Sequence, residues 1–348
     1  MSVAQENRPF AIDTPLGQDV LLLTGLHGTE AISRLYHFDL RMISENHAIA
    51  FEEIIGEDAT ISIHLADGSL RYLHGMISRF SQGSGGGDDD SEMRYAFYEA
   101  ALVPRLWLLT QTTDCRIFQN QSVPEIAQTL FGEHSLNDVS LRLSGAYDAR
   151  EYTVQYRESD FDFVSRLLEA EGIYYFFEHE EGKHTLVLAD SPGEHKPCPG
   201  QESASCQRSG GALLTADVLE RLNVVKEIRA GKCTLCDFNF EAPKTDLSVS
   251  VDAVARLGPG DRELYDYPGA YTRRSAGDRL TTIRMEAEEC RITSIRGAGG
   301  CRAFVSGYRF RLTDYYREDM NDKAYVLTRI SHDLDQSAEY PGVYGEGE

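Results

Sequence analysis

Residues 156–189 have the sequence YRESDFDFVSRLLEAEGIYYFFEHEEGKHTLVLA, which carries the clearest structural signals in the chain. Ser159 is placed to cap a helix, because its hydroxyl can accept from the backbone amide of Asp162 in an acidic first turn. Apolar residues then recur at helical intervals up to Gly172, a residue type that often ends helices because it tolerates positive φ. The β-branched and aromatic run 173–177 and the shorter run 185–188 enclose a Glu-Glu-Gly-Lys turn. The stretch therefore predicts a helix that feeds a β-hairpin.

Strand patterns dominate the chain on both sides of this stretch. Short alternating runs with polar turns fill residues 8–109 and are typical of a small barrel or sandwich. Strand patterns resume over 217–240 and over 303–332, and residues 276–289 are the best helix candidate between them. Ser122, followed by Pro124 and Glu125, predicts a second helix from residue 123. The predicted fold class is therefore α+β, mostly β.

The composition is that of an ordinary globular protein with an acidic surface. The chain has 348 residues, of which 41% are hydrophobic and 26% charged, and a formal charge of −22. Because nucleic acids and anionic membranes attract basic surfaces, neither is expected as a partner. The seven cysteines form no regular framework, which fits a chain that folds in a reducing cytosol. The first residues lack the basic and apolar segments of a secretory signal, so folding in the cytoplasm is expected.

Three motifs, in order along the chain, carry a resemblance to a known family. The first runs from Pro104 through Arg116-Ile117-Phe118, the second is the stretch 156–189, and the third lies between residues 307 and 332. The matching residues in the first two motifs are Pro104, Trp107, Arg116, Phe118, Tyr156, Glu158, Asp160, Phe163, Leu168, Glu169, Glu171 and Gly172. These motifs resemble the signature of VgrG proteins, the tip components of the type VI secretion apparatus, which are related to the baseplate hub of contractile phage tails.

The resemblance implies a phage-tail-hub-like fold with two barrel-like β domains per chain and α+β segments inserted between and around them. On this layout the first barrel-like domain spans residues 1–110, and an α+β segment with the helix and hairpin spans 111–200. The second barrel-like domain takes 201–242 and 290–340, with an inserted α+β segment over 243–289. Residues 341–348 form a tail.

The resemblance also implies a structural function. Such a chain would form a homotrimeric ring that caps the hexameric tube of Hcp, supports the spike, and takes part in the delivery of effectors. The expected partners are the Hcp tube, further copies of the chain, and effector or adaptor proteins. The protein would assemble in the cytoplasm and leave through the type VI machinery.

The sequence departs from the family after the hub. VgrG proteins usually continue into an OB-like domain and a trimeric β-spike with valine- and glycine-rich repeats, and no such repeats occur before Glu348. A natural truncation or an expressed fragment would each account for this. Because the spike would supply much of the association energy, we expect only weak trimers, and neither membrane binding nor membrane piercing is expected.

Two other functions stay open. A hub of a phage or phage-like contractile tail differs from a secretion tip in its biological setting but hardly in its physics. An enzyme, such as a cell-wall hydrolase or an effector, would need a concave site with perturbed carboxylates. With 56 acidic residues in the chain, no carboxylate pair can be singled out from the sequence.

Two groups of potential metal ligands fit a structural role better. His179, Glu180 and His184 have the wrong spacing for a zinc-protease helix, and they lie in a predicted hairpin. Cys233 and Cys236 have zinc-knuckle spacing, with His195, Cys198 and Cys206 as conceivable further ligands. However, positions three apart in a strand point to opposite faces, so buried free thiols are expected. No catalytic, cofactor-binding or metal-binding residue is predicted, and no cofactor.

Two further patterns have equally simple interpretations. The stretch GSGGGDDD, residues 83–90, lacks the lysine of a phosphate loop and the alternation of a calcium loop, so it is predicted to be a solvated hairpin tip. The aromatic run Tyr174-Tyr175-Phe176-Phe177 is predicted to be the hydrophobic seam between helix and hairpin rather than a ligand platform.

Overall fold

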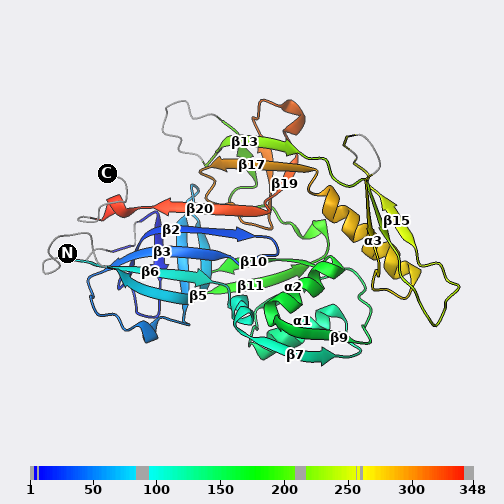
Figure 1. Cartoon of the computed structure of the whole chain (residues 1–348). Helices are drawn as coiled ribbons and strands as arrows, with labels where there is room; N and C mark the ends of the chain where they lie inside the picture. The colour runs from blue at the N-terminus through cyan, green and yellow to red at the C-terminus, as the bar shows by residue number, and fades with distance from the viewer. Residues whose placement is uncertain are drawn as a thin grey trace.

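A curled, antiparallel seven-stranded sheet forms the first β unit (Figure 1). The computed structural model describes residues 4–5, 8–83, 94–207, 217–255, 257–258 and 262–340, so the predicted tip 83–90 (beyond Gly83) and the tail lie outside the described residues. The strand order is β1 (Phe10–Asp13), β4 (Asp58–His64), β5 (Leu70–Gly83), β6 (Ala96–Val103), β3 (His37–Ser44), β2 (Leu22–Ala31) and β20 (Arg329–Asp335). The strands alternate as predicted, and Phe38, Leu40 and Leu102 are fully buried beneath them.

The last strand of this sheet comes from the far end of the chain. The sequence layout groups residues 329–335 with the second β domain, but β20 pairs with β2 along its whole length, from Gly25 opposite Asp335 to Ala31 opposite Arg329. The sequence of a single edge strand does not indicate which strand it pairs with, because the pairing depends on which sheet edge is open in the fold. The C-terminal region therefore closes back onto the first unit.

A helix-and-ribbon unit lies beside the first sheet. It comprises η3 (Arg105–Gln111), β7 (Thr113–Phe118), α1 (Val123–Glu133), β8 (Val139–Arg142), β9 (Thr153–Ser159) and α2 (Asp160–Glu171). Both predicted helices begin as expected: Ser122 and Glu125 form a capping box, and the Ser159 hydroxyl accepts from the Asp162 amide at 3.0 Å. Helix α2 ends at Gly172, whose φ is 72°.

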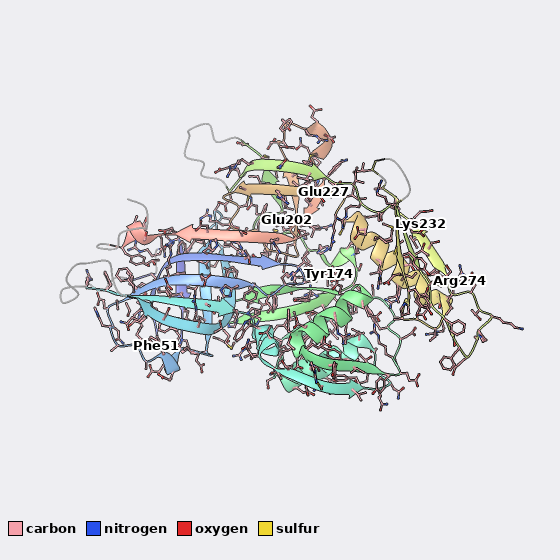
Figure 2. The ribbon with its side chains drawn as sticks, viewed as in Figure 1. Phe51, Tyr174, Glu202, Glu227, Lys232 and Arg274 are labelled. Carbon is pink, nitrogen blue, oxygen red and sulfur yellow. The ribbon has the colours of Figure 1, made fainter. Side chains whose placement is uncertain are left out.

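The predicted hairpin consists of β10 (Tyr174–Glu180) and β11 (Lys183–Ala189), which lie near the middle of the view in Figure 1, and Figure 2 labels Tyr174 at its start. Its two faces contribute to two hydrophobic cores. Successive side chains of a strand point to opposite faces. One face contributes Tyr175, Phe177, Leu186 and Leu188 to the core of the first unit and the helices, and the other contributes Phe176, Val187 and Ala189 to a second core. The aromatic run is thus a seam, as predicted, but it joins two β units rather than only helix and hairpin.

The second core belongs to a β unit of short strands. These are β12 (Ser203–Ser205), β13 (Leu219–Lys226), β17 (Thr293–Gly299), β18 (Arg309–Thr313) and β19 (Ala324–Val326). A bridge between Cys206 and Leu219 connects the β12–β18–β19 sheet to the β13–β17 pair. The apolar side chains of Phe304, Phe310 and Leu312 fill the space beneath them.

An inserted unit extends on the other side of the molecule, where α3 covers a small sheet (Figure 1). The sheet order is β15 (Val249–Asp252), β14 (Lys232–Leu235) and β16 (Glu263–Asp266), and α3 spans Arg274–Glu289. Helix α3 agrees with the predicted 276–289. The strand pattern predicted over 217–240 extends too far, because β14 ends at Leu235 and the segment after it is a loop. Strand β14, which the sequence layout places before the insertion, pairs with β15 and β16 inside it; the domain boundaries as a whole stay a prediction.

The remaining helical elements are short. They are the 3₁₀ turns η1 (Phe51–Glu53), η4 (Pro192–Glu194), η5 (Glu318–Met320) and η6 (Ser337–Glu339). Across the described part of the chain, every helix is too short or too polar to cross a bilayer.

Candidate interface and junction residues

Asp160 joins four elements of the helix-and-ribbon unit. The carboxylate stands at the first turn of α2 and is 1% exposed. Its oxygens accept from Gln155 Nε2 at 2.7 Å and Arg116 Nη2 at 3.5 Å, and lie 2.8 Å from His134 Nε2. A buried carboxylate is stable only with such partners, so the two signature residues Arg116 and Asp160 fix the ribbon and α1 to the start of α2.

The apolar signature residues form the packed interior of the same unit. The rings of Phe118 and Phe163 stack with centroids 5.5 Å apart, and Arg116 lies over Phe118 at 5.2 Å. Leu168 is buried on the same helix. Pro104 is the N-cap residue directly before η3, and its carbonyl accepts the amide of the half-buried Trp107. The turn η3 packs against α2.

The end of α2 contacts the inserted unit. Glu171 is 8% exposed and binds Arg150 at 2.6 Å through one oxygen and Arg279 of α3 through the other. At Gly172 a Cβ would lie 2.9 Å from Ile283 of α3, so only glycine fits both the positive φ and the close approach. Glu169, another signature residue, is exposed. The structure thus brings most of the signature residues together around α2.

Tyr156 is the exception among the apolar signature residues, because it is 63% exposed. Strand register places Cys115 opposite Tyr156 and Ile117 opposite Val154 on one face of the β7–β9 ribbon. We define the ribbon stripe as the exposed side chains Cys115, Ile117, Tyr152, Val154 and Tyr156. The flanking signature residue Glu158 binds Arg166 with both oxygens. A contiguous exposed apolar face of this kind marks an interaction surface.

A buried ion pair of the first β unit, Glu30 with Arg71, connects this unit to the second one through hydrogen bonds to Ser306 and Arg302. Glu30 of β2 is 3% exposed and accepts from Arg71 Nη2 at 2.6 Å and from the Ser306 hydroxyl at 3.0 Å, with His332 Nε2 at 2.8 Å. Arg71 also donates to the Arg302 carbonyl at 2.9 Å. Burial alone would raise the pKa of Glu30, but Arg71 and His332 outweigh it and hold that pKa well below its usual range.

Three histidine rings connect the first sheet to the hairpin. Nδ1 of His179 accepts the His74 amide at 3.1 Å, and Nε2 of His184 accepts the Arg105 amide at 3.2 Å. Because Nε2 of His184 accepts, its Nδ1 carries the proton and donates to Nδ1 of His74 at 2.9 Å. Burial lowers the pKa of His179 to about 4 and that of His184 to about 2. Burial also lowers the pKa of His74. All three rings are therefore uncharged near neutral pH, and their hydrogen bonds link the first sheet to the hairpin.

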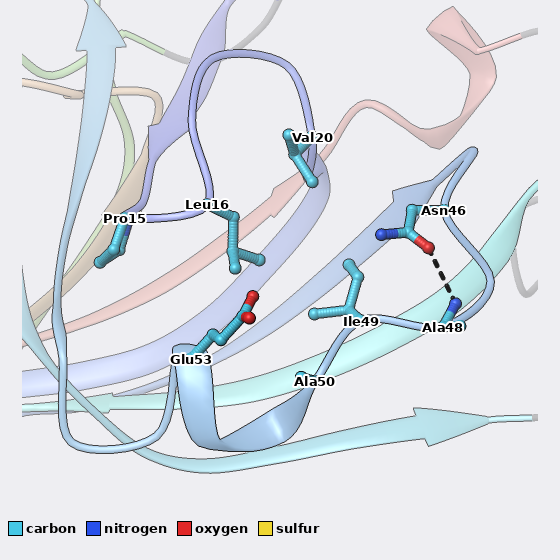
Figure 3. A pocket seen from close by; sticks show the side chains of 8 residues that line it. All are labelled: Pro15, Leu16, Val20, Asn46, Ala48, Ile49, Ala50 and Glu53. Carbon is cyan, nitrogen blue, oxygen red and sulfur yellow. Dashed lines mark hydrogen bonds between the residues drawn. The ribbon is translucent and has the colours of Figure 1, made fainter.

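Two of the hollows on the described part of the surface have polar side chains in their linings. One, of about 410 Å³, is lined by His74 and His184 and by the ion pairs Asp58–Arg105 (2.8 Å) and Lys183–Asp138 (2.9 Å). The other, of about 640 Å³, lies between the loops around Leu16 and Ile49. Figure 3 shows its apolar side chains with Glu53 as the one carboxylate among the residues that line it.

The potential metal ligands in the sequence have structural places. His179 and His184 face each other across the hairpin, and Cys233 is buried under α3. Cys236 lies beyond the end of β14, and His195 Nδ1 is 2.8 Å from the Gly307 carbonyl oxygen. Among the described residues no three His, Cys, Asp or Glu side chains are grouped as a metal site would require.

The sequence reasoning missed the junction residues Glu30, Arg71 and His332. Glu30 and His332 lie on strands that are hundreds of residues apart in the chain. In the sequence, each of the three resembles an ordinary polar residue of an alternating strand. The signal that could have found Glu30 is that no other Asp, Glu, Lys or Arg occurs in its strand, residues 22–31.

Comparison with known proteins shows which family has this architecture. Residues 29–338 match the family described as phage tail baseplate hub (GPD). The type VI secretion system spike proteins VgrG1b and VgrG1a of Pseudomonas aeruginosa are 39% and 38% identical over 94% and 99% of this chain. The matched regions are 43% and 52% of those proteins, so the chain spans about half the length of the curated relatives it matches.

A solved structure shows the same fold. The E. coli c3393 protein, a component of the type VI secretion system with structural similarity to the T4 tail proteins gp27 and gp5, superposes with a TM-score of 0.67. The match covers 94% of this chain and 73% of that chain at 21% identity. The chain therefore belongs to the phage tail baseplate hub (GPD) family, and corresponds to the N-terminal hub region of VgrG spike proteins.

Proposed function

We propose that this chain is the hub of a type VI secretion tip, in which three copies close into a ring that caps the Hcp tube, supports the spike and takes part in effector delivery. The observation that carries the proposal is the hairpin shared by two cores in a chain of the baseplate hub family. Because one face of the hairpin packs in each core, the two β units form a single rigid block. A rigid block is what a ring that transmits force along a tube requires.

The proposal is that this block works by shape and contact rather than by turnover. It is supported by the hollow lined by His74 and His184, where Asp58 and Asp138 are paired with Arg105 and Lys183. Assembly would take place in the cytoplasm, followed by export through the machine. Hydrolysis of purified peptidoglycan that is lost on a single carboxylate substitution would contradict this.

We assign the ribbon stripe to the contact between neighbouring copies. It is apolar at its centre, and charges of both signs flank it: Asp114 and Glu158 are acidic, whereas Arg166 and Arg157, whose guanidinium lies 5.1 Å from the centroid of the Tyr156 ring, are basic. Such a balanced rim suits a surface of the same protein, whose overall charge is −22. A permanent ring would be expected to bury roughly 2,000 Å² or more at each interface.

The experiment combines the purified chain with Hcp. Light scattering measures the mass of the chain as its concentration is raised, and electron microscopy of Hcp tubes then shows whether one end carries a ring. We expect concentration-dependent trimers and capped tubes, both lost in the double variant Val154→Ser/Tyr156→Ser. A chain that stays monomeric at every concentration and leaves the tubes bare contradicts the proposal. Exposed Tyr316→Ser serves as the matched control.

The family name itself favours one alternative, a hub of a phage-like contractile tail. It uses the same ring and the same tube contact. The genes next to this one would separate the two settings, because a tail cluster would encode capsid and tail-fibre proteins.

A further inference from the structure

The inserted unit is joined to the rest of the chain at two neighbouring points. It follows β13, which ends at Lys226, and leads into β17, which begins at Thr293. The Glu227 amide donates to the Ile292 carbonyl at 2.9 Å, so the two connecting segments run side by side as a neck, where Figure 2 labels Glu227. The β13–β17 pair that carries the neck is a two-stranded ribbon, and such ribbons vary more in twist than wider sheets. The neck therefore allows the unit beyond it to turn.

The inserted unit also has a hydrophobic core of its own. Buried Cys233, Leu235, Val249 and Met285 pack together in it, and α3 covers the small sheet. Within the described part of the chain, no cluster of buried apolar side chains joins this core to the core of either β unit. A unit with a separate core can move as one body, and relative motion is the expected behaviour where its interface is small and polar.

One face of α3 contacts the end of α2. Arg279 donates to the carboxylate of Glu171 and, at 3.4 Å, to the carbonyl of the same residue. Its guanidinium also lies 5.6 Å from the centroid of the Tyr147 ring. The apolar part of the contact is Ile283 against Gly172, a residue that has no side chain to interlock with it. We call the contact of Arg279 with Glu171 the latch.

The charges are arranged so that the latch can open. Glu171 is 8% exposed, and a buried carboxylate without a partner is strongly destabilising. However, Arg150, in the segment between β8 and β9, donates to the other oxygen of Glu171 at 2.6 Å. Glu171 keeps this partner when Arg279 leaves, and the Arg279 side chain, already 37% exposed, returns to water. The second ion pair of the contact, Arg273 with Asp148, is exposed on both sides and contributes little.

We propose that the inserted unit is a hinged arm, which turns as one body about the neck and is held against α2 by the latch. Arg279 lies about 15 Å along the axis of α3 from its last residue, Glu289, which precedes the neck. The latch therefore acts on a long lever and fixes the position of the whole unit. When the latch opens, the end of α2 and the Tyr147 ring become accessible. This motion goes beyond the hub function and is independent of the ring and of the tube.

Pulsed electron spin resonance between two spin labels measures the position of the arm. One label is attached to Gln128→Cys on α1, and the other to Phe240→Cys in the loop after β14, because both native side chains are exposed. Cys115→Ser and Cys290→Ser remove the two exposed native thiols. This four-substitution protein is the labelled background, and mass spectrometry verifies two labels per chain.

Two variants of the labelled background test the latch. Arg279→Gln removes its charge. Arg284→Gln is the matched control, because Arg284 lies on the same helix but binds Asp266 inside the arm. We expect one narrow distance distribution in the background and in the control. In Arg279→Gln we expect a second population of about 10% or more.

Two further measurements keep the result unambiguous. In the labelled background, raising the salt from about 0.1 M to about 1 M shortens the screening length from about 10 Å to about 3 Å and should produce the same second population. If Arg279→Gln does not fold, as judged by circular dichroism, this salt series decides by itself. Hydrogen exchange of the β14 amides should be the same in both variants, because the arm turns without unfolding.

Three outcomes overturn the proposal. The first is a distance distribution that neither Arg279→Gln nor high salt changes, since the arm is then fixed or never latched. The second is an equal change in Arg284→Gln, which would mean that the effect does not come from the latch. The third is faster exchange of β14 in Arg279→Gln, which would mean that the unit unfolds rather than turns.

Discussion

Tyr175 and Phe176 are adjacent in the chain, yet their side chains lie in two different hydrophobic cores. Tyr175 faces the first β unit, where its carbonyl accepts the Ser33 amide at 2.7 Å. Phe176 faces the second unit, where it meets Tyr308 edge-on with ring centroids 6.0 Å apart. One strand thus serves as the wall between two units, and damage to either face should act on a different part of the protein.

Replacement of Phe176 should loosen the second unit. Phe176→Ala removes a ring that is 1% exposed, and such truncations cost about 3–5 kcal/mol of unfolding free energy. Urea unfolding measures the loss, and limited proteolysis should show earlier cleavage within residues 190–330. Tyr316→Ala, at a ring that is 81% exposed, should change stability by less than about 0.5 kcal/mol. A similar small effect for both would mean that Phe176 does not support the second core.

Gly172 tests the contact between α2 and the inserted unit. Gly172→Ala adds the backbone strain of φ 72° and a contact of 2.9 Å with Ile283. Gly182→Ala is the matched control, because φ is 67° and no atom lies within 4 Å of its Cβ. We expect about 1–2 kcal/mol of lost stability for the control and more for Gly172→Ala.

A double-mutant cycle isolates the Ile283 contribution. In an Ile283→Ala background, Gly172→Ala should cost no more than the control does, because the three closest atoms are all in the Ile283 side chain. Thermal unfolding gives all four values. If the excess persists in this background, the clash is not with Ile283.

Removal of the Glu30 charge should be severe. Glu30→Gln leaves the guanidinium of Arg71, whose side chain is 7% exposed, without its carboxylate, and loss of one partner of a buried pair costs about 3–5 kcal/mol. Asp319→Asn, which breaks the exposed pair with Arg317, should cost much less, because solvent screens an exposed pair. Chemical unfolding compares the two. Glu30→Gln/Arg71→Met should recover much of the loss, and a double variant no better than the single one would argue against an electrostatic cause.

The buried histidines His74, His179 and His184 predict that the unfolding free energy is lower in acid. The pKa of His179 is about 4 in the folded chain and near 6.5 when unfolded, so between these values the unfolded chain binds the proton and the folded chain does not. The unfolding free energy should therefore fall as pH falls through this window, by up to about 1.4 kcal/mol per pH unit for each such histidine. Below the usual pKa of a glutamate, protonation of Glu30, whose folded pKa is also lowered, acts in the same direction.

His179→Gln separates this effect from general acid denaturation. The glutamine oxygen can still accept the His74 amide but does not titrate, so the slope of unfolding free energy against pH should decrease between pH 6.5 and about 4. Urea unfolding at a series of pH values provides the slope. An unchanged slope would mean that His179 is not one of the titrating groups.

Much of the fold was predictable because its signals are local. Ser159 and Gly172 bound α2 through hydrogen bonds and backbone angles within a few residues, so the helix limits follow from the sequence itself. The hairpin follows from its β-branched and aromatic runs and the glycine turn. The roles proposed for the twelve signature residues stay a prediction, although the structure places most of them around α2.

Caps, periodicity and ordered motifs are properties of neighbouring residues, so the helices, the hairpin and the family follow from the sequence. Three features instead depend on contacts between distant residues: β20 pairs with β2, Glu30 meets Arg71, and Tyr156 is exposed while Phe163 is buried. An amphipathic pattern specifies which face of an element is apolar but not what covers that face. Partners far apart in the chain are selected only when the cores assemble.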